Sequence, residues 1–317
     1  MSALPDWARA LGPPLFSARI RCSPQEFIVT ELLEIDFSSD GEHDWLWIEK
    51  TGANTAWVAE QLARHAGIKE RDVGYAGLKD RHAITRQWFS VRRPSGEGTD
   101  WHAFKVEGVE VLDGHRHQRK LKRGAHKGNA FRIAVRSEAI DSNRDLLTDR
   151  LQAIAVHGVP NYFGEQRFGR DGANIELGRS VVAGRRVSRH KRSIGISALR
   201  SLEFNNELSA RVDAGTWNRL LAGHKANLDG SRSVFDVDEV TPELARRCAE
   251  LDIHPTGTLP GFETIRVEEG HRPLRMRVKN LEWKIDDDAL WLEFILDKGC
   301  FATALLRELI RSDSSTD

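Results

Sequence analysis

The chain has 317 residues, of which 40% are hydrophobic and 30% charged, and its 47 basic and 47 acidic residues leave no formal net charge at pH 7. This length suffices for one or two domains with their own cores, and the neutral balance excludes a uniformly basic, histone-like protein. No segment is apolar for long enough to span a bilayer, and the N-terminus lacks the apolar region of a secretion signal. We therefore expect a cytoplasmic protein. The three cysteines, Cys22, Cys248 and Cys300, lie far apart and match neither a zinc pattern nor an even-numbered disulfide set.

The first 160 residues alternate between strand and helix patterns. Asn54 or Thr55 can cap a helix that runs to Ala66, and a second helix is predicted from about Arg144 to Val156. Apolar residues typical of half-buried strands predict strands at 26–32, 45–49, 87–91, 104–112 and 131–135.

The pattern changes near residue 157. Helical patterns dominate from there to about Gly270, with a clear helix start at Thr241 and Pro242. Residues 289–296 then alternate as a strand, and 301–311 form an amphipathic helical pattern. Strand-rich outer segments around a helix-rich middle predict a mixed α/β domain that an inserted domain interrupts.

Positive charge is concentrated in three segments that contain no acidic residue, namely 115–136, 179–192 and 272–279. The compensating acids collect elsewhere, for example at 286–288. A neutral protein with segregated charge can present a positive surface to phosphate groups. The alternative is that these segments are ordinary solvated surface, and their composition alone leaves both interpretations open.

The densest polar segment, 74–85, places Asp80 directly between Lys79 and Arg81. Nearby positive charge favours the ionised form of an aspartate, which is then available as a nucleophile or a base. The alternative is an exposed turn before a strand, whose charges are simply solvated.

Two further segments combine polar and aromatic residues. In 127–131, Asn129 can donate and accept hydrogen bonds and Phe131 can stack on a base, although a hairpin turn with Phe131 in the core explains the same pattern. In 161–169, two glycines, an arginine and three aromatic residues predict a loop pinned by its own aromatic side chains, with an RNA-contacting wedge as the alternative.

Together and in this order, these segments resemble the TruD family of tRNA pseudouridine synthases. The matching stretches cover nearly the whole chain: GLKDRHAITRQW at 77–88, KGNAF at 127–131, VPNYFGEQRFGRDGAN at 159–174, KRSIGISALRSLEFN at 191–205, LPG at 259–261 and GCFATALLREL at 299–309.

The resemblance implies an α/β (α+β) fold and an isomerase. It implies a pseudouridine-synthase catalytic domain with a central mixed or antiparallel sheet, formed by 1–157 and 272–317, and an inserted TRUD domain at 158–271. The implied reaction converts uridine to pseudouridine in tRNA, at position 13 of the D-stem in the bacterial family, without a metal or an organic cofactor.

The resemblance also implies site residues. It places the catalytic aspartate at Asp80 and the pocket residues at Phe27, Asn129, Phe131 and Phe301. The carboxylate would either attack C1′ of the ribose or take a sugar proton, and the residues leave this choice open.

Cations are expected around this pocket. We expect Arg21 to be the partner of Asp80 and Lys79 to border the substrate. Contacts with the tRNA backbone are expected from Lys127, Arg123, Arg167 and Arg192. The chain departs from the family pattern in two places: the stretch 230–270 is shorter than the family's inserted domain, and Arg21 stands where lysine also occurs in relatives.

Two other functions compete with this one. A non-catalytic protein that binds structured RNA, or an RNA chaperone, would keep the basic segments without needing Asp80. A metal-dependent nuclease would need paired acids such as Asp36 or Asp44, and their spacing gives it no support. We expect a monomer that acts on tRNA, with no protein or membrane partner.

Overall fold

The computed structural model describes residues 4–93, 98–229, 231, 233–286 and 289–312. The chain divides into two compact units. The strand unit comprises Ala18–Arg144, Lys279–Gly299 and Ser312–Asp317, and the mixed unit comprises Met1–Ser17, Asp145–Val278 and Cys300–Arg311.

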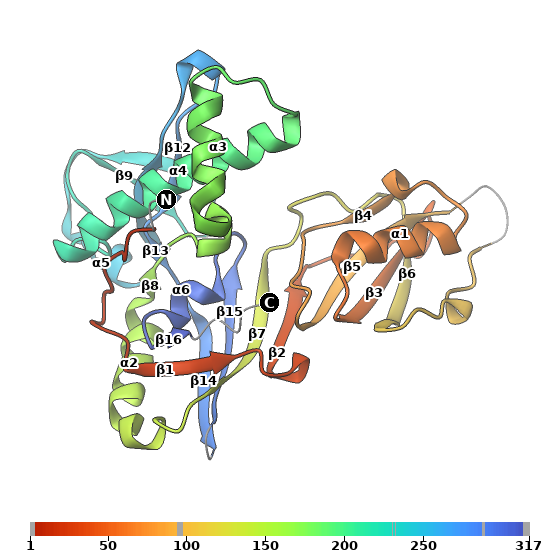
Figure 1. Cartoon of the computed structure of the whole chain (residues 1–317), viewed down its shortest axis with the longest axis horizontal. Helices are drawn as coiled ribbons and strands as arrows, with labels where there is room; N and C mark the ends of the chain where they lie inside the picture. Colours follow the sequence, from red (N-terminus) through yellow and green to blue (C-terminus); the bar gives the residue numbers. More distant parts are fainter. Residues whose placement is uncertain (1–3, 94–97, 230, 232, 287–288, 313–317) are drawn as a thin grey trace. The chain divides into compact units, whose positions relative to one another are not determined.

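The strand unit is built on one mixed sheet with the strand order β14-β15-β7-β2-β5-β3-β6 (Figure 1). Strand β1 pairs with β7, and β4 pairs with β5. Only β2 and β5 run parallel among the paired strands described in this unit; the other pairs are antiparallel. The strands are β1 (Phe16–Ile20), β2 (Phe27–Leu32), β3 (His43–Thr51), β4 (Val73–Tyr75), β5 (Ile84–Arg92), β6 (Val109–His117), β7 (Gly128–Arg136), β14 (Lys279–Asp286) and β15 (Ala289–Asp297).

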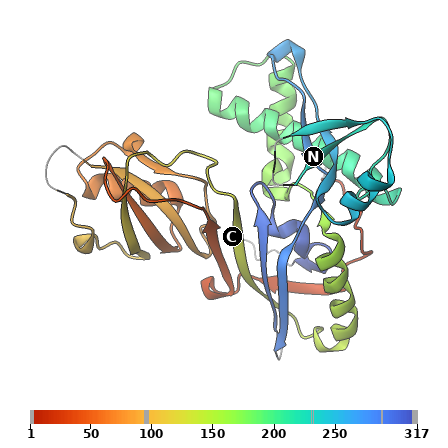
Figure 2. The same ribbon diagram turned by 180° about the vertical axis from the view of Figure 1, so that it is seen from behind.

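Helix α1 (Thr55–His65) covers one face of this sheet, and the strands lie in front of it in the reverse view (Figure 2). The Asn54 side chain accepts a hydrogen bond from the backbone N–H of Ala56, as the sequence predicts for an N-cap. The apolar face of the helix, including Val58 and Leu62, packs with Ile48 and other core residues of the sheet. Burying this face stabilises both layers.

The register between β2 and β7 determines which side chains meet. Phe27 is opposite Ile133, Val29 is opposite Phe131, and Glu31 is opposite Asn129. Opposed residues of an antiparallel pair lie on the same face of the sheet, and residues two apart share that face. Two polar residues, Glu31 and Asn129, therefore lie on the face that carries Phe27 and Phe131.

The first residue of β7, Gly128, lies where the neighbouring strand passes close to the backbone. A Cβ atom at Gly128 would lie 2.3 Å from the main-chain oxygen of Leu296. We expect Gly128→Ala to lower the free energy of unfolding by about 1–3 kcal/mol, as overpacking in a core does. Urea denaturation measures this loss. Gly114→Ala is the control, since its Cβ would make only ordinary contacts, and equal effects of the two variants would contradict the prediction.

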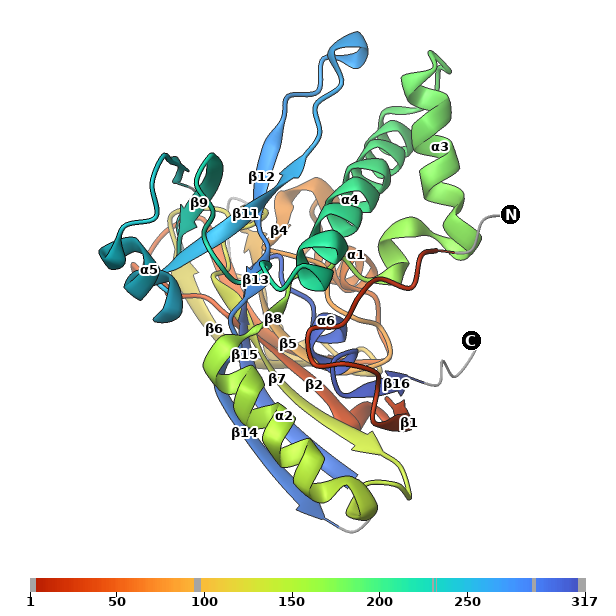
Figure 3. The same ribbon diagram turned by 90° about the vertical axis from the view of Figure 1, so that its left-hand side faces the viewer.

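The mixed unit combines a long helix pair with small sheets. Helices α3 (Ala173–Val182) and α4 (Arg189–Asp213) lie side by side (Figure 3), and their backbones meet closely at Gly178 and Gly195. A four-stranded sheet has the order β10-β9-β11-β12, and β8 pairs with β13. The remaining elements are α2 (Arg144–His157), α5 (Pro242–Ala249), α6 (Ala302–Leu306), β8 (Val159–Pro160), β9 (His224–Leu228), β10 (Val234–Val237), β11 (Ile253–Leu259), β12 (Gly270–Pro273), β13 (Arg275–Met276) and β16 (Ile310–Ser312). Within the described residues, no helix combines the length and hydropathy that a bilayer crossing requires.

Several predicted elements need correction. Beyond α4, the predicted helix start at Thr241 and Pro242 is confirmed by α5. The rest of the expected helical character up to Gly270 is wrong, because β9–β12 form a sheet whose four- to seven-residue strands are too short for a clear period. The helix predicted at 301–311 ends at Leu306 and is followed by β16. The strand predicted at 104–112 begins only at Val109.

The mixed unit extends beyond the inserted segment 158–271. Trp7 is buried in its core and stacks on Tyr162, and Arg307 donates hydrogen bonds to the main-chain oxygens of Trp7 and Ala8. These contacts place both the N-terminal segment and Cys300–Arg311 in the mixed unit. The division into a catalytic domain (1–157 and 272–317) and an inserted domain (158–271) stays a prediction about family domains.

Candidate active site

Asp80 lies in the strand unit, in the loop that joins β4 to β5. Its side chain is 40% exposed, so the carboxylate is accessible to a ligand. Arg21 Nη2 lies 3.3 Å from Asp80 Oδ2, and the Arg21 guanidinium lies 4.2 Å from the centroid of the Phe27 ring. The structure thus brings together three of the predicted site residues: a carboxylate, its cation and an aromatic ring.

Arg21 adopts an unusual backbone conformation. Its φ is 61°, in the left-handed region that residues with a Cβ adopt at an energetic cost. Arg21 stands between β1 and β2, where this conformation turns the chain and directs the guanidinium toward Asp80. Such outliers are concentrated at functional sites, which supports a role for Arg21 there.

A buried lysine holds the main chain of Asp80. Lys50 on β3 is fully buried, and its ammonium donates a hydrogen bond of 2.8 Å to the main-chain oxygen of Asp80. Burial lowers the pKa of Lys50 to about 8, although the Asp80 charge opposes this shift. Lys50 is absent from the residues predicted from sequence, because its position in a strand carries no motif.

A chain of polar side chains anchors the rest of the loop. Thr55 accepts a hydrogen bond of 3.0 Å from the backbone N–H of Lys79 and donates one of 3.1 Å to Gln87 Oε1. The Gln87 amide in turn donates to the main-chain oxygen of Gly77. The backbone on both sides of Leu78 is therefore fixed, and Asp80 is presented from a rigid support.

Lys79, which is predicted to border the substrate, is bound to two protein side chains. Its ammonium is buried, lies 3.0 Å from Glu31 Oε2 and donates a hydrogen bond of 2.8 Å to Asn129 Oδ1. Burial raises the pKa of Glu31, and the charge of Lys79 opposes this rise. Lys79 thus contacts the buried Glu31 and the partly buried Asn129.

The His126 ring packs against the β4–β5 loop at Gly77. A Cβ atom at Gly77 would lie 3.2 Å from the His126 ring, so glycine permits this close approach. Burial, together with the charges of Lys79 and Lys298, lowers the pKa of His126 to about 4. The ring is therefore neutral in the folded protein at pH 7.

This lowered pKa predicts a pH dependence of stability. Between pH 6.5 and pH 4 the unfolded chain binds a proton at residue 126 that the folded protein does not, so stability falls as the pH falls. We expect His126→Asn to remove up to about 3 kcal/mol of this loss. Denaturation at pH 7 and pH 4.5 measures the difference. The exposed His157→Asn is the control, and identical losses in His126→Asn and wild type would contradict the prediction.

Aromatic residues line the same face of the sheet. Phe27 is buried, and Phe131 is partly buried and stacks on Phe294 with a centroid separation of 5.2 Å. Phe301 belongs to the mixed unit, where its ring lies 6.2 Å from Phe163. Within the strand unit, Arg21 therefore links Phe27 to Asp80, and Phe131 shares the sheet face of Phe27, whereas Phe301 belongs to the other unit.

The four cations expected at the tRNA backbone have unequal accessibility. Lys127 is exposed and pairs with Glu34, and the exposed Arg123 lies over the Tyr75 ring. The remaining two belong to the mixed unit. Arg192 is exposed and donates to a main-chain oxygen, whereas Arg167 is half-buried and donates to Ser197 Oγ. Burial lowers the pKa of Arg167.

The cations of the basic segment 272–279 are largely engaged with other protein groups. Arg275 is buried, Arg272 donates to the Asn161 side chain, Arg277 pairs with Asp229, and Lys279 pairs with Asp297. Its composition alone left a phosphate-binding role open, and the structure shows these cations buried or bound to other protein groups. The segment 179–192 differs, because its cations beyond residue 184 are exposed.

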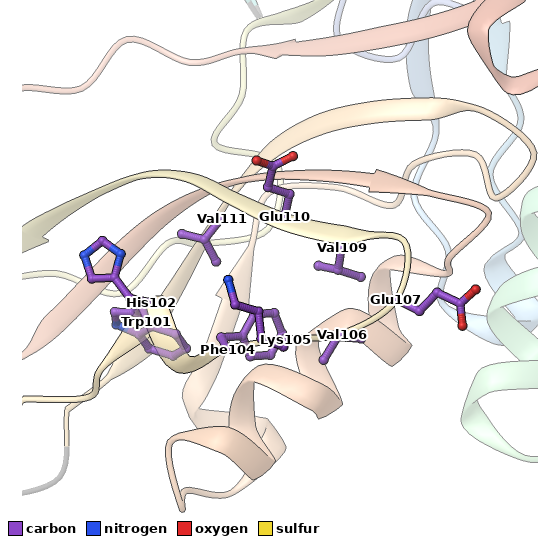
Figure 4. Close-up of a pocket in the computed structure, with 9 residues that line it drawn as sticks. All are labelled: Trp101, His102, Phe104, Lys105, Val106, Glu107, Val109, Glu110 and Val111. Carbon is purple, nitrogen blue, oxygen red and sulfur yellow. The ribbon is translucent and has the colours of Figure 1, made fainter.

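A pocket of about 440 Å³ opens beside β6, where Trp101, Phe104 and Val109 are among the lining residues (Figure 4). None of its nine lining residues belongs to the predicted site.

The structure gives no support to the metal-dependent nuclease interpretation. Asp44, one of the acids considered for it, accepts a hydrogen bond from the Trp101 indole. Across the described ranges, no group of three His, Cys, Asp or Glu side chains is placed to hold a metal ion.

Comparison with known proteins identifies relatives over almost the full length. The family model for tRNA pseudouridine synthase D (TruD) matches residues 13–188. A Methylococcus capsulatus protein named tRNA pseudouridine synthase D is 43% identical, over 97% of this chain and 95% of its own length. A Hydrogenovibrio crunogenus protein of the same name is 39% identical, over 97% and 96%. A Methanosarcina mazei crystal structure that bears the TruD name superposes with a TM-score of 0.72 at 20% identity, over 98% of this chain and 96% of that one, and shows the shared fold.

Proposed function

The chain belongs to the TruD family of tRNA pseudouridine synthases, and we propose that it isomerises uridine 13 in the D-stem of tRNA with Asp80 as the catalytic carboxylate. The target position and the role of Asp80 rest on the family resemblance of segments such as 77–88 and 159–174. The observation that carries the proposal is the accessible Asp80 carboxylate, which pairs with the Arg21 guanidinium; this guanidinium lies over the Phe27 ring.

The reaction needs a carboxylate at the ribose face of the nucleotide. The N1–C1′ bond breaks, the uracil turns, and a C5–C1′ bond forms; C5 loses its proton and N1 gains one, so no atoms are lost overall. Asp80 either attacks C1′ or takes a sugar proton, and the Arg21 guanidinium stabilises the negative charge that both roles require.

The remaining residues retain the uracil and the tRNA. Aromatic surfaces such as Phe131 can hold the detached base by stacking, and Asn129 can hydrogen-bond its edge. We include Phe301 in this pocket by resemblance. The exposed Lys127, Arg123 and Arg192 supply positive charge for the phosphate backbone, while the half-buried Arg167 is better suited to supporting the aromatic cluster around Phe163.

We further propose that the enzyme needs no metal or organic cofactor, acts in the cytoplasm and is monomeric, with no protein partner. A non-catalytic RNA-binding protein or chaperone is not favoured, because the matched relatives named as synthases span nearly the whole chain.

The proposal is tested on unmodified tRNA transcripts that differ only at position 13, with uridine in one and cytidine in the other. The protein is incubated with each in EDTA, and pseudouridine is mapped by carbodiimide labelling and primer extension. We expect a stop at position 13 of the uridine transcript alone. Modification at another uridine, with none at 13, would overturn the assigned position.

A further inference from the structure

A buried ion pair between Glu31 and Lys79 contacts the Asn129 side chain. The Glu31 side chain is fully buried and that of Lys79 is 4% exposed, and their charged atoms lie 3.0 Å apart. Glu31 Oε1 also accepts a hydrogen bond of 3.2 Å from the backbone N–H of Trp88 on β5. The ion pair is thereby fixed to two strands of the sheet.

This ion pair determines which way the Asn129 amide faces. Lys79 Nζ lies 2.8 Å from Asn129 Oδ1, and an ammonium group can only donate. The amide oxygen must therefore point at Lys79, and the Nδ2 group, with two donors, points away from it. In an isolated asparagine these two orientations would be nearly equivalent in shape.

We propose that Glu31 is a positioning residue that acts through Lys79 to lock Asn129 as a hydrogen-bond donor toward a carbonyl oxygen of the uracil. This inference rests on the proposed function. Glu31 and Asn129 are opposite each other in the β2–β7 register, and Phe131 lies on the same face two residues along β7. A base stacked near Phe131 would therefore have its edge within reach of the Asn129 amide.

The chemistry of the base fits a donor at this place. Uracil carries two carbonyl oxygens, which accept hydrogen bonds, whereas cytosine carries an amino group in place of one of them. An amide that could turn freely would present an acceptor as readily as a donor. Without the fixed orientation, a fraction of the enzyme molecules would present the Asn129 amide oxygen to the uracil carbonyl. These two oxygens cannot form a hydrogen bond, so the detached uracil would be held poorly during its rotation.

Three variants separate a positioning role from a merely structural one. Glu31→Gln keeps the shape of the side chain but removes its charge. Asn129→Asp keeps the shape of residue 129 but replaces the donor group with an oxygen. The third variant is Asn129→Ala, made alone and together with Glu31→Gln. Glu49→Gln is the matched control, since Glu49 pairs with Arg86 at 2.7 Å between neighbouring strands, outside the contacts of Asn129.

The readouts are kcat and KM on the uridine-13 transcript, and the midpoint of thermal unfolding. We expect Glu31→Gln to lower kcat about tenfold in the wild-type background and less than about twofold in the Asn129→Ala background, because coupled residues are not additive. We expect Asn129→Asp to lose as much activity as Asn129→Ala, and Glu49→Gln to match wild type.

Equal fold-losses from Glu31→Gln in both backgrounds would show that Glu31 does not act through Asn129. An active Asn129→Asp, with an unfolding midpoint like that of wild type, would show that no donor is needed there. Either result overturns the inference, but it leaves the proposed function intact as long as the wild-type protein forms pseudouridine. Absence of pseudouridine with the wild-type protein would instead count against the proposed function.

Discussion

Replacing Asp80 by Asn should reduce the formation of pseudouridine by about 10³-fold or more and leave the affinity for tRNA almost unchanged. The amide has the shape of the carboxylate, but it neither attacks C1′ effectively nor takes a sugar proton. Arg21 loses a partner that is 40% exposed, and such pairs contribute at most about 1 kcal/mol to stability. The fold should therefore be retained.

The measurement compares single-turnover rates and tRNA dissociation constants of wild type and Asp80→Asn at one salt concentration. Asp141→Asn is the control, because it removes another carboxylate that pairs with an arginine, in this case Arg144. A variant that keeps more than about a tenth of the wild-type rate would show that Asp80 is not the reacting group. A loss of tRNA binding equal to the loss of rate would make it a binding residue.

Lys79→Met should lower the free energy of unfolding by about 3–5 kcal/mol at pH 8, which is the cost of leaving one member of a buried ion pair without its partner. Lys79 and Glu31 are both buried, so water cannot replace the lost cation. Replacing both residues, as Lys79→Met with Glu31→Leu, should recover most of the loss, because two apolar side chains can pack where the two charges met.

The pH dependence distinguishes this explanation from a simple loss of packing. Burial already raises the pKa of Glu31, and Lys79 is the group that opposes the rise. In Lys79→Met the folded state therefore binds a proton that the unfolded state releases above about pH 4.5. The stabilising effect of that proton is present at low pH and disappears as the pH rises, so the variant should be less destabilised at pH 5 than at pH 8.

Urea denaturation of wild type, Lys79→Met and the double variant at both pH values measures these effects. Lys284→Met is the control for a lysine whose pair with Asp286 is exposed, and it should change stability by less than about 0.5 kcal/mol. A Lys79→Met variant as stable as wild type at pH 8 would show that Glu31 does not depend on this cation.

Several local elements of the strand unit could be predicted because they carry their own patterns, whereas β1, β4 and β14 were not predicted. Residues of β2 and of the second half of β3 alternate between buried and partly buried positions, and α1 has a capping asparagine before an apolar stripe. The motif around Asp80 was equally visible. The short strands β9 and β10 were missed, because four or five residues are too few to establish a period.

The supporting residues were missed for a different reason. Glu31 meets Lys79, and Lys50 meets Asp80, only because strands distant in sequence pair in one register. One signal was available: Glu31 continues the buried series Phe27, Val29, Glu31, so a charge at that position needs a buried partner. No sequence pattern identified that partner as Lys79, which was expected to border the substrate instead.

The accessibility of charged side chains was the other property that the sequence left open. The residues 272–279 have the composition of a phosphate-binding surface, yet Arg275 is buried and Lys279 pairs with Asp297. Burial depends on tertiary contacts that composition does not contain. Charge counts along the chain therefore overestimate the positive surface that an RNA can reach.

The most direct test of Asp80-dependent isomerisation follows the hydrogen at C5 of uridine. Formation of the C5–C1′ bond releases this hydrogen to water, so a transcript labelled with tritium at C5 reports turnover without any label on the enzyme. In EDTA, wild type should release one equivalent of tritium per uridine at position 13, and Asp80→Asn should release almost none while still binding the transcript. Full release by the variant, or none by a wild-type protein that binds the tRNA, would contradict the account.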